Sequence, residues 1–87
     1  MSMTDTAWTA IAAAETLAHA RGLELDSRLT PESLRLEFRR RSEVTCWLEL
    51  DASLLNACED LAAVRDLVER EVAVVLQMRH GAHLPRS

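Results

Sequence analysis

Small and apolar residues recur at every third or fourth position near the start of the chain. The residues that share this face are Ala7, Ala10, Ile11, Ala14, Leu17 and Ala18. The spacing predicts an amphipathic helix that Thr4 or Asp5 caps at its N-terminus. Arg21 and Gly22 are typical of a helix end, because a cation suits the last turn and glycine readily adopts the left-handed conformation that follows. We therefore expect the helix to end near Arg21, with a small-residue face that another backbone can approach closely.

The period then changes from helical to alternating. Apolar residues occupy every second position over 34–38 and again over 44–50. Two alternating runs joined by a short turn predict an antiparallel hairpin with one apolar face. The turn, residues 40–43, contains no glycine, so its type stays open. A helix over 31–41 is an open alternative, because its apolar positions also fit helical spacing. We interpret residues 23–33 as a connector.

A second helical stripe occupies the C-terminal part of the chain. The residues on its apolar face are Leu54, Cys58, Leu61, Val64, Val68, Val72 and Val75. The stripe ends near His80, where Gly81 predicts a stop. A break near 56–60 is open, because Asp60 is a second candidate N-cap. An unbroken helix would be about 39 Å long, whereas a strand of the hairpin spans only about 23 Å. The apolar segment 72–76 would then overhang the sheet.

This overhanging segment predicts self-association. It is apolar on nearly every side, and an exposed apolar patch usually marks an interface. The predicted self-association residues are Val72, Val74, Val75, Leu76 and Met78. The chain has 87 residues and little aromatic content, so its core must be built from Leu, Val and Ala. Small domains with such cores are often completed by a second copy. The alternative is that the first helix covers the segment within one chain.

These elements together predict the α+β fold class. We expect a small α-β-β-α domain in which a two-stranded antiparallel hairpin packs with two helices and dimerisation completes the core. Residues 1–87 form a single small domain, with a disordered N-terminus over 1–4 and a loose C-terminal tail over 81–87. In element order the chain resembles small phage head–tail joining proteins, and this resemblance implies a structural or assembly role in a phage.

Charge and composition narrow the function classes. The net charge of −4 argues against general nucleic-acid binding, where neutralisation of phosphates supplies most of the affinity. Every basic residue is arginine, and a lysine-free chain rich in Ala, Leu and Arg is typical of a GC-rich bacterial or phage coding sequence. The N-terminus lacks the basic and apolar regions of a signal peptide, and no apolar run approaches the length of about 18 residues that spans a bilayer. We expect a cytoplasmic protein without membrane contact.

Two patterns that suggest chemistry have a simpler structural explanation. Residues 79–85 resemble the signature of histidine acid phosphatases, but His83 stands where that family has its second arginine. The resemblance is short, and a helix end with cations and a glycine explains it. Cys46 and Cys58 lack the paired spacing of zinc knuckles, and each falls on the apolar side of its element. We therefore expect no enzymatic activity, no cofactor and no metal site.

The remaining features predict a binding surface. Arg39, Arg40 and Arg41 form a basic cluster at the predicted turn, and the arginine fork suits carboxylates and phosphates alike. The alternation directs Trp47 away from the core-facing Cys46, and an exposed tryptophan on a sheet is a good contact residue. We predict that Trp47 and these arginines bind a protein partner. The chain would then be a small non-catalytic binding module, an inhibitor or accessory protein of a phage or mobile element that occupies a partner surface. The alternative is a nucleic-acid-binding accessory protein that uses the arginine turn.

Overall fold

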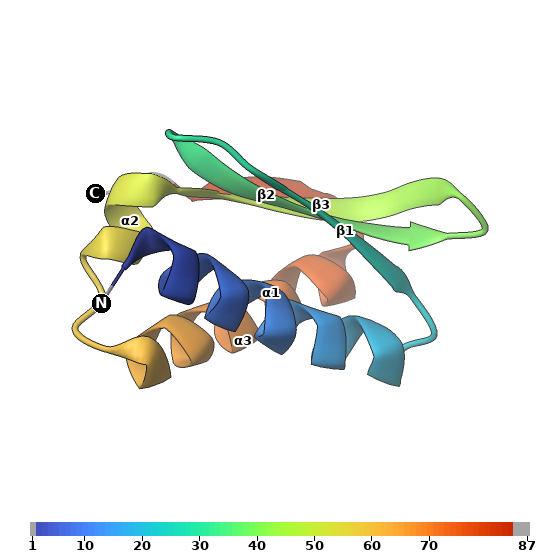
Figure 1. Ribbon diagram of the computed structural model, residues 1–87. Coiled ribbons are helices and arrows are strands. Elements are labelled where there is room, and N and C mark those ends of the chain that lie inside the picture. The colour runs from blue at the N-terminus through green and yellow to red at the C-terminus, as the bar shows by residue number, and fades with distance from the viewer. Residues whose placement is uncertain (1, 85–87) are drawn as a thin grey trace.

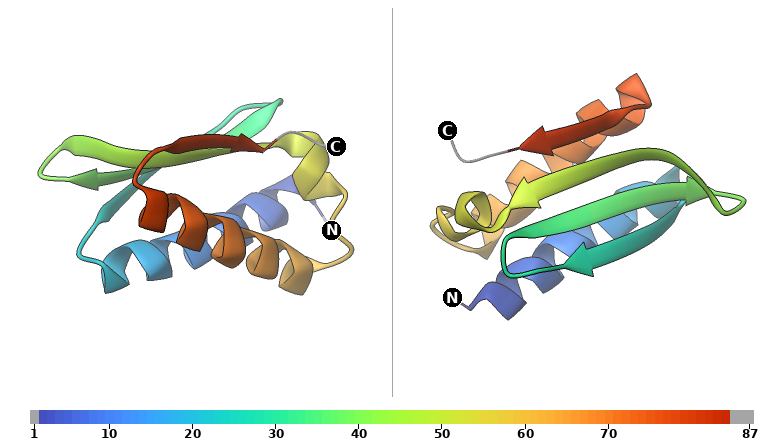
Figure 2. Two further views of the ribbon diagram at one scale, coloured as in Figure 1. Left: turned by 180° about the vertical axis from the view of Figure 1, so that it is seen from behind. Right: turned by 90° about the horizontal axis from the view of Figure 1, so that it is seen from above.

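A four-stranded sheet carries both long helices on one of its faces (Figure 1). The computed structural model describes residues 2–84. The elements in chain order are α1 (Met3–Ala20), β1 (Glu24–Leu29), β2 (Ser33–Arg40), β3 (Glu43–Asp51), α2 (Ala52–Asn56), α3 (Leu61–Met78) and β4 (Gly81–Leu84). The strands lie in the order β1-β2-β3-β4; β1, β2 and β3 pair antiparallel, and β4 pairs parallel to β3. Figure 2 shows the outer face of this sheet from above, with α1 and α3 behind it.

The α+β class is confirmed, but the expected α-β-β-α topology with a two-stranded hairpin is wrong. The hairpin itself is present as β2 and β3, and the alternative of a helix over 31–41 is excluded. The predicted connector contains β1, and the predicted loose tail contains β4; residues 85–87 lie outside the described part. Neither strand was predicted: the alternation of β1 is short and is interrupted by Ser27, and β4 has only four residues. Dimerisation stays a prediction.

The first helix begins two or three residues earlier than expected. Ser2 is its N-cap, and the Ser2 hydroxyl accepts a hydrogen bond from the Asp5 N–H at 3.2 Å. Met3 and Thr4 are therefore helical, so a disordered segment over 1–4 is wrong for these two residues, while Met1 lies outside the described range. The predicted stop is confirmed, because Gly22 adopts the left-handed conformation at φ 70°. The buried face of α1 is mostly alanine, and these small side chains allow α1 to pack closely against α3.

The C-terminal stripe is two helices rather than one. Asp60 caps α3, since its Oδ1 accepts a hydrogen bond from the Ala63 N–H at 2.8 Å. The chain turns back at this cap, and α3 lies under the sheet instead of extending beyond it (Figure 1). Arg79, at φ 59°, takes the left-handed position that ends α3, and Gly81 is instead the first residue of β4.

This return of the chain buries most of the segment predicted to self-associate. Val72, Val75 and Leu76 belong to the core of the single chain, with exposures of 0%, 2% and 5%. The prediction of an uncovered apolar segment is wrong for these residues, because α1 and the sheet cover them. Val74 and Met78 remain exposed, and self-association through them stays a prediction.

Candidate functional site

The outer face of the sheet carries a chain of ion pairs across β1, β2 and β3. Arg35 donates from Nε to Glu37 at 2.9 Å and from Nη1 to Glu49 at 3.2 Å. Arg39 donates from Nη2 to Glu37 at 3.0 Å, and its Nε lies 2.7 Å from a carboxylate oxygen of Asp26. The two arginines hold the pKa of the Glu37 carboxyl below its ordinary value, mainly through these hydrogen bonds. Each charge of this network therefore has an opposite charge beside it within the chain, although the buried Arg39 Nε makes no hydrogen bond to Asp26.

Trp47 lies within this network. The sequence alternation is confirmed at this point, because Cys46 is buried beneath the sheet and Trp47 is on the outer face. The Arg35 guanidinium sits over the indole at 4.3 Å from the ring centroid, a cation–π arrangement. On β4, Gly81 is the register partner of Trp47, and its missing side chain leaves the space that the indole fills. Trp47 is thus half-covered by its own chain, and its role in partner binding stays a prediction.

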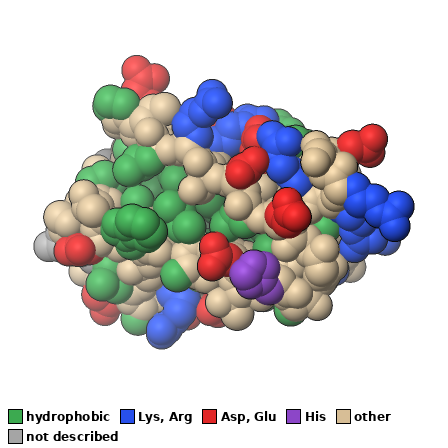
Figure 3. Space-filling model, turned by 45° about the vertical axis from the view of Figure 1, so that its right-hand side comes forward, with side chains coloured by type: hydrophobic (Ala, Val, Ile, Leu, Met, Phe, Trp, Pro, Cys, Tyr) green, Lys and Arg blue, Asp and Glu red, His purple; other side chains and the backbone are tan. Residues whose placement is uncertain are grey.

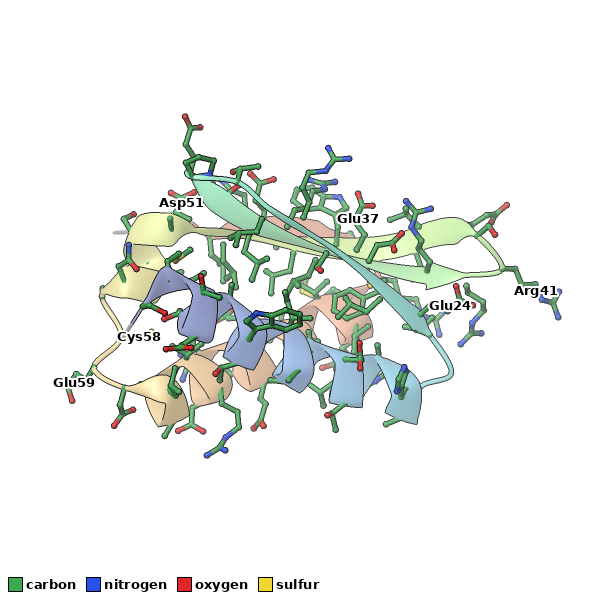
Figure 4. The ribbon with its side chains drawn as sticks, in the orientation of Figure 1. Glu24, Glu37, Arg41, Asp51, Cys58 and Glu59 are labelled. Atoms are coloured by element: carbon green, nitrogen blue, oxygen red, sulfur yellow. The ribbon has the colours of Figure 1, made fainter. Side chains whose placement is uncertain are left out.

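The predicted arginine cluster divides between two surfaces. Arg39 points to the outer face and is tied to acidic side chains, as described above. Arg40 faces a cleft of about 420 Å³ at the end of the molecule where the β2–β3 turn projects beyond the helices (Figure 1). Arg41 lies at the tip of that turn and points outward (Figure 4). It borders a second, shallower hollow together with Arg40, Thr45 and Glu43.

The cleft is positively charged at its rim and largely apolar at its floor. Its lining residues are Arg21, Leu23, Arg40, Thr45, Cys46, Leu76 and Arg79. No carboxylate is among these residues, although Glu43 borders the adjacent hollow. We call this site the arginine cleft. Its arrangement suits an anionic group that is attached to an apolar one.

The ends of separate elements bring the arginines of this cleft together. Arg21 follows α1 and Arg79 follows α3, so both cations lie at helix C-termini, where the free carbonyl groups favour positive charge. Arg40 ends β2, and its Nη2 donates a hydrogen bond to the Arg21 carbonyl oxygen at 3.1 Å. The local sequence around Arg21 and Arg79 predicts helix-end cations, but it does not predict that they converge. The local signal was present, but only the packing of helices under the hairpin places them beside Arg40.

The turn that presents Arg41 is strained. Arg41 and Ser42 have φ values of 54° and 69°, so both central residues are left-handed, as a two-residue type I′ hairpin turn requires. Asn and Gly adopt this conformation at lower cost than Arg and Ser. The Arg39 Nη1 donates a hydrogen bond to the Ser42 carbonyl oxygen at 3.3 Å and holds the turn. The hairpin thus displays a cation at its tip at some cost in stability.

The cysteines and histidines do not form a reactive group. Cys46 lies on the floor of the arginine cleft, and burial raises the pKa of its thiol, so the thiol stays protonated near neutral pH and is a weak nucleophile. Burial also raises the pKa of the Cys58 thiol, which follows α2 at the opposite end of the molecule from Arg41 (Figure 4). His83 is on β4, with Nε2 2.7 Å from Asp51, and His80 bonds the neighbouring Gly81 carbonyl. Within residues 2–84 no three Cys, His, Asp or Glu side chains gather as metal ligands.

No protein-family model, no curated protein and no solved structure matches the chain. Over the range that the structure describes, neither long helix combines the length and hydropathy needed to cross a bilayer.

Proposed function

We propose that this chain is a small non-catalytic binding module that holds an acidic segment of a partner protein in the arginine cleft. The observation that carries the proposal is the convergence of Arg21, Arg40 and Arg79 on one cleft with an apolar floor. The segment would place carboxylates against the guanidinium groups and an apolar side chain against the floor. By binding such a segment and covering this surface of the partner, the module would act as an inhibitor or accessory protein.

Charge distribution supports this choice of ligand. The chain as a whole has a net charge of −4, so the positive charge at the cleft is a local exception. The acidic remainder of the surface repels other acidic regions and favours approach at this end. Arginine is suited to the task, because its planar guanidinium donates two parallel hydrogen bonds to one carboxylate.

The sequence-predicted contact residues contribute unequally to the proposed surface. Arg40 lines the cleft, and Arg41 extends the positive surface along the turn. Arg39 and Trp47 belong to the outer face and are engaged by Glu37 and Arg35. The proposal therefore assigns the electrostatic contact to Arg40 with Arg21 and Arg79, and leaves the outer face as a secondary surface.

Binding of a defined peptide tests the proposal. The probe is a dye-labelled peptide in which glutamates flank a central leucine, titrated with the full chain and followed by fluorescence anisotropy. The matched peptide has glutamine in place of each glutamate. We expect measurable binding of the acidic peptide only. Arg40→Glu should weaken it roughly tenfold or more, because a hydrogen bond to a charged group contributes about 1.5–3 kcal/mol.

Arg65→Glu is the matched control. Arg65 is exposed on α3 and does not line the cleft, so this variant changes the net charge equally and should leave the affinity unchanged. Equal weakening by both variants would contradict a local site, because it would show a response to net charge alone. Tighter, Arg40-dependent binding of a DNA oligonucleotide than of the peptide would replace the proposed protein ligand with nucleic acid. Circular dichroism of each variant checks that it is folded.

A further inference from the structure

The β1 strand is an open edge of the sheet. Its inner neighbour is β2, and in the described chain no strand pairs with its other side. At the end of the strand, the Thr30 N–H donates to the Ser33 carbonyl at 2.9 Å, which fixes the direction of the backbone groups. Because these directions alternate along an antiparallel pair, Leu25, Ser27 and Leu29 turn their N–H and C=O groups outward. These groups form a template for another strand.

The side chains of β1 are complementary to a second copy of the same strand. We propose that two chains associate through antiparallel pairing of β1 with β1, centred on Ser27. In this register Asp26 lies opposite Arg28 of the second copy, and Leu25 lies opposite Leu29 of the second copy. The outward N–H and C=O groups all meet partners, and the ion pairs fall at the narrow, non-hydrogen-bonded positions where side chains are closest.

Neighbouring registers are disfavoured by charge. A shift that centres the pair on Asp26 places two aspartates opposite each other, and a shift that centres it on Arg28 places two arginines opposite each other. Like charges directly across a strand pair are destabilising. A pairing register that differs by a single residue places residues from opposite faces of the sheet across from each other. The leucines would then lie on the wrong face, and the outward N–H and C=O groups would miss their partners. Charged side chains on an edge strand disfavour its pairing with unrelated strands. On β1 the same charges also favour one register of self-pairing over its neighbours.

The environment of Arg28 within one chain supports this pairing. Its register partner on β2 is Arg35, which is already engaged by Glu37 and Glu49. Among the described residues, Arg28 has no ion pair of its own. A second copy would bring Asp26 to Arg28 and relieve the unfavourable pair of arginines. Asp26 would then lie between Arg39 of its own chain and Arg28 of the other copy.

Large apolar side chains are exposed on β1 and on α1, the helix that contacts it. Leu29 is 47% exposed on β1, and Trp8 on α1 is 66% exposed. Figure 3 shows hydrophobic side chains gathered on this side of the molecule. A two-fold axis through Ser27 perpendicular to the sheet places both helix layers on the same face of the joint sheet, with α1 of each copy facing the other. The pairing would therefore cover apolar surface in addition to the strand edge.

Charge reversal tests this inference without reference to the arginine cleft. The mass of the full chain is measured by light scattering across a dilution series. The unmodified chain should be a dimer that dissociates on dilution. Asp26→Arg alone and Arg28→Asp alone each create like-charge pairs on both sides of the axis, so each should raise the dissociation constant roughly tenfold or more.

Two combinations should restore association. The double variant Asp26→Arg with Arg28→Asp regains opposite charges, and so does an equimolar mixture of the two single variants, which should form a mixed dimer. Glu24→Arg is the control on the same strand, because Glu24 faces an uncharged threonine of the second copy in this register and should leave association unchanged. Circular dichroism verifies that each variant is folded.

Several outcomes would overturn the inference. A monomer at every concentration of the unmodified chain would do so, as would single variants that remain fully dimeric. Failure of the two single variants to associate on mixing would exclude this register. Dissociation by Met78→Asp but not by Arg28→Asp would place the interface on α3 instead.

Discussion

Gly81 offers the sharpest test of how the outer face is packed. It begins β4 directly beside Trp47, and a Cβ added at this position would overlap the indole ring. The backbone of Gly81 is not left-handed, unlike that of Gly22. Alanine is therefore disfavoured at position 81 because its methyl group lacks space, not because of the backbone conformation. The indole cannot yield freely, because the Arg35 guanidinium lies over it at 4.3 Å. Gly81→Ala should therefore displace either Trp47 or β4.

The expected cost follows from two opposing effects. Overpacking by an added methyl group typically destabilises by about 1–3 kcal/mol. Replacing glycine by alanine recovers about 0.4–1 kcal/mol, because the unfolded chain loses conformational freedom. We expect Gly81→Ala to lower the free energy of unfolding by about 1–2 kcal/mol. In a chain of this size each kcal/mol lowers the melting temperature by about 4–8 °C.

Urea denaturation of a double-mutant cycle measures this effect. In a Trp47→Ala background the indole is gone, so Gly81→Ala should be neutral or slightly stabilising. Gly22→Ala is the control: nothing lies within 4 Å of the added methyl group, but φ is 70°, so its cost should be the same with and without Trp47. If Gly81→Ala destabilises both backgrounds equally, the overlap with the indole is not its cause and the reasoning is refuted.

Three further predictions concern a cap, a turn and an ion pair. Asp60→Ala removes the α3 cap and should lower the free energy of unfolding by about 1 kcal/mol. Asp66→Ala within the same helix is the control and should change the free energy of unfolding by no more than about 0.5 kcal/mol. Urea denaturation measures both variants. The double substitution Arg41→Asn, Ser42→Gly relieves two left-handed residues and should raise the free energy of unfolding by about 1 kcal/mol, and no change in melting temperature would contradict the assigned strain. The lowered pKa of Glu37 contributes stability that is present above the pKa of an unfolded glutamate and is lost as the pH falls through the folded value. Glu37→Gln should therefore show a smaller loss of stability between about pH 5 and pH 3, measured by urea denaturation at each pH; an unchanged pH profile would exclude that contribution.

The sequence determined the features that depend on neighbouring residues. Helical spacing and the Arg21–Gly22 stop predicted the first helix and the place where it ends, and strict alternation predicted the β2–β3 hairpin. Alternation also assigned Cys46 to the core and Trp47 to the outer face, because successive side chains of a strand point to opposite sides. The candidate cap at Asp60 was visible, but the sequence did not decide whether the helix broke there.

The tertiary structure decided what depends on residues far apart in the chain. β1 and β4 are strands because β2 and β3 offer them backbone partners; the alternation of β1 is interrupted at Ser27, and β4 is too short to show one. The turn at Asp60 brought α3 under the sheet, so residues predicted to mediate self-association became core. The arginine cleft likewise required two helix ends to meet a hairpin end, a coincidence in space that no local spacing encodes. Periodicity specifies which face of an element is apolar, but only packing specifies which partner covers it.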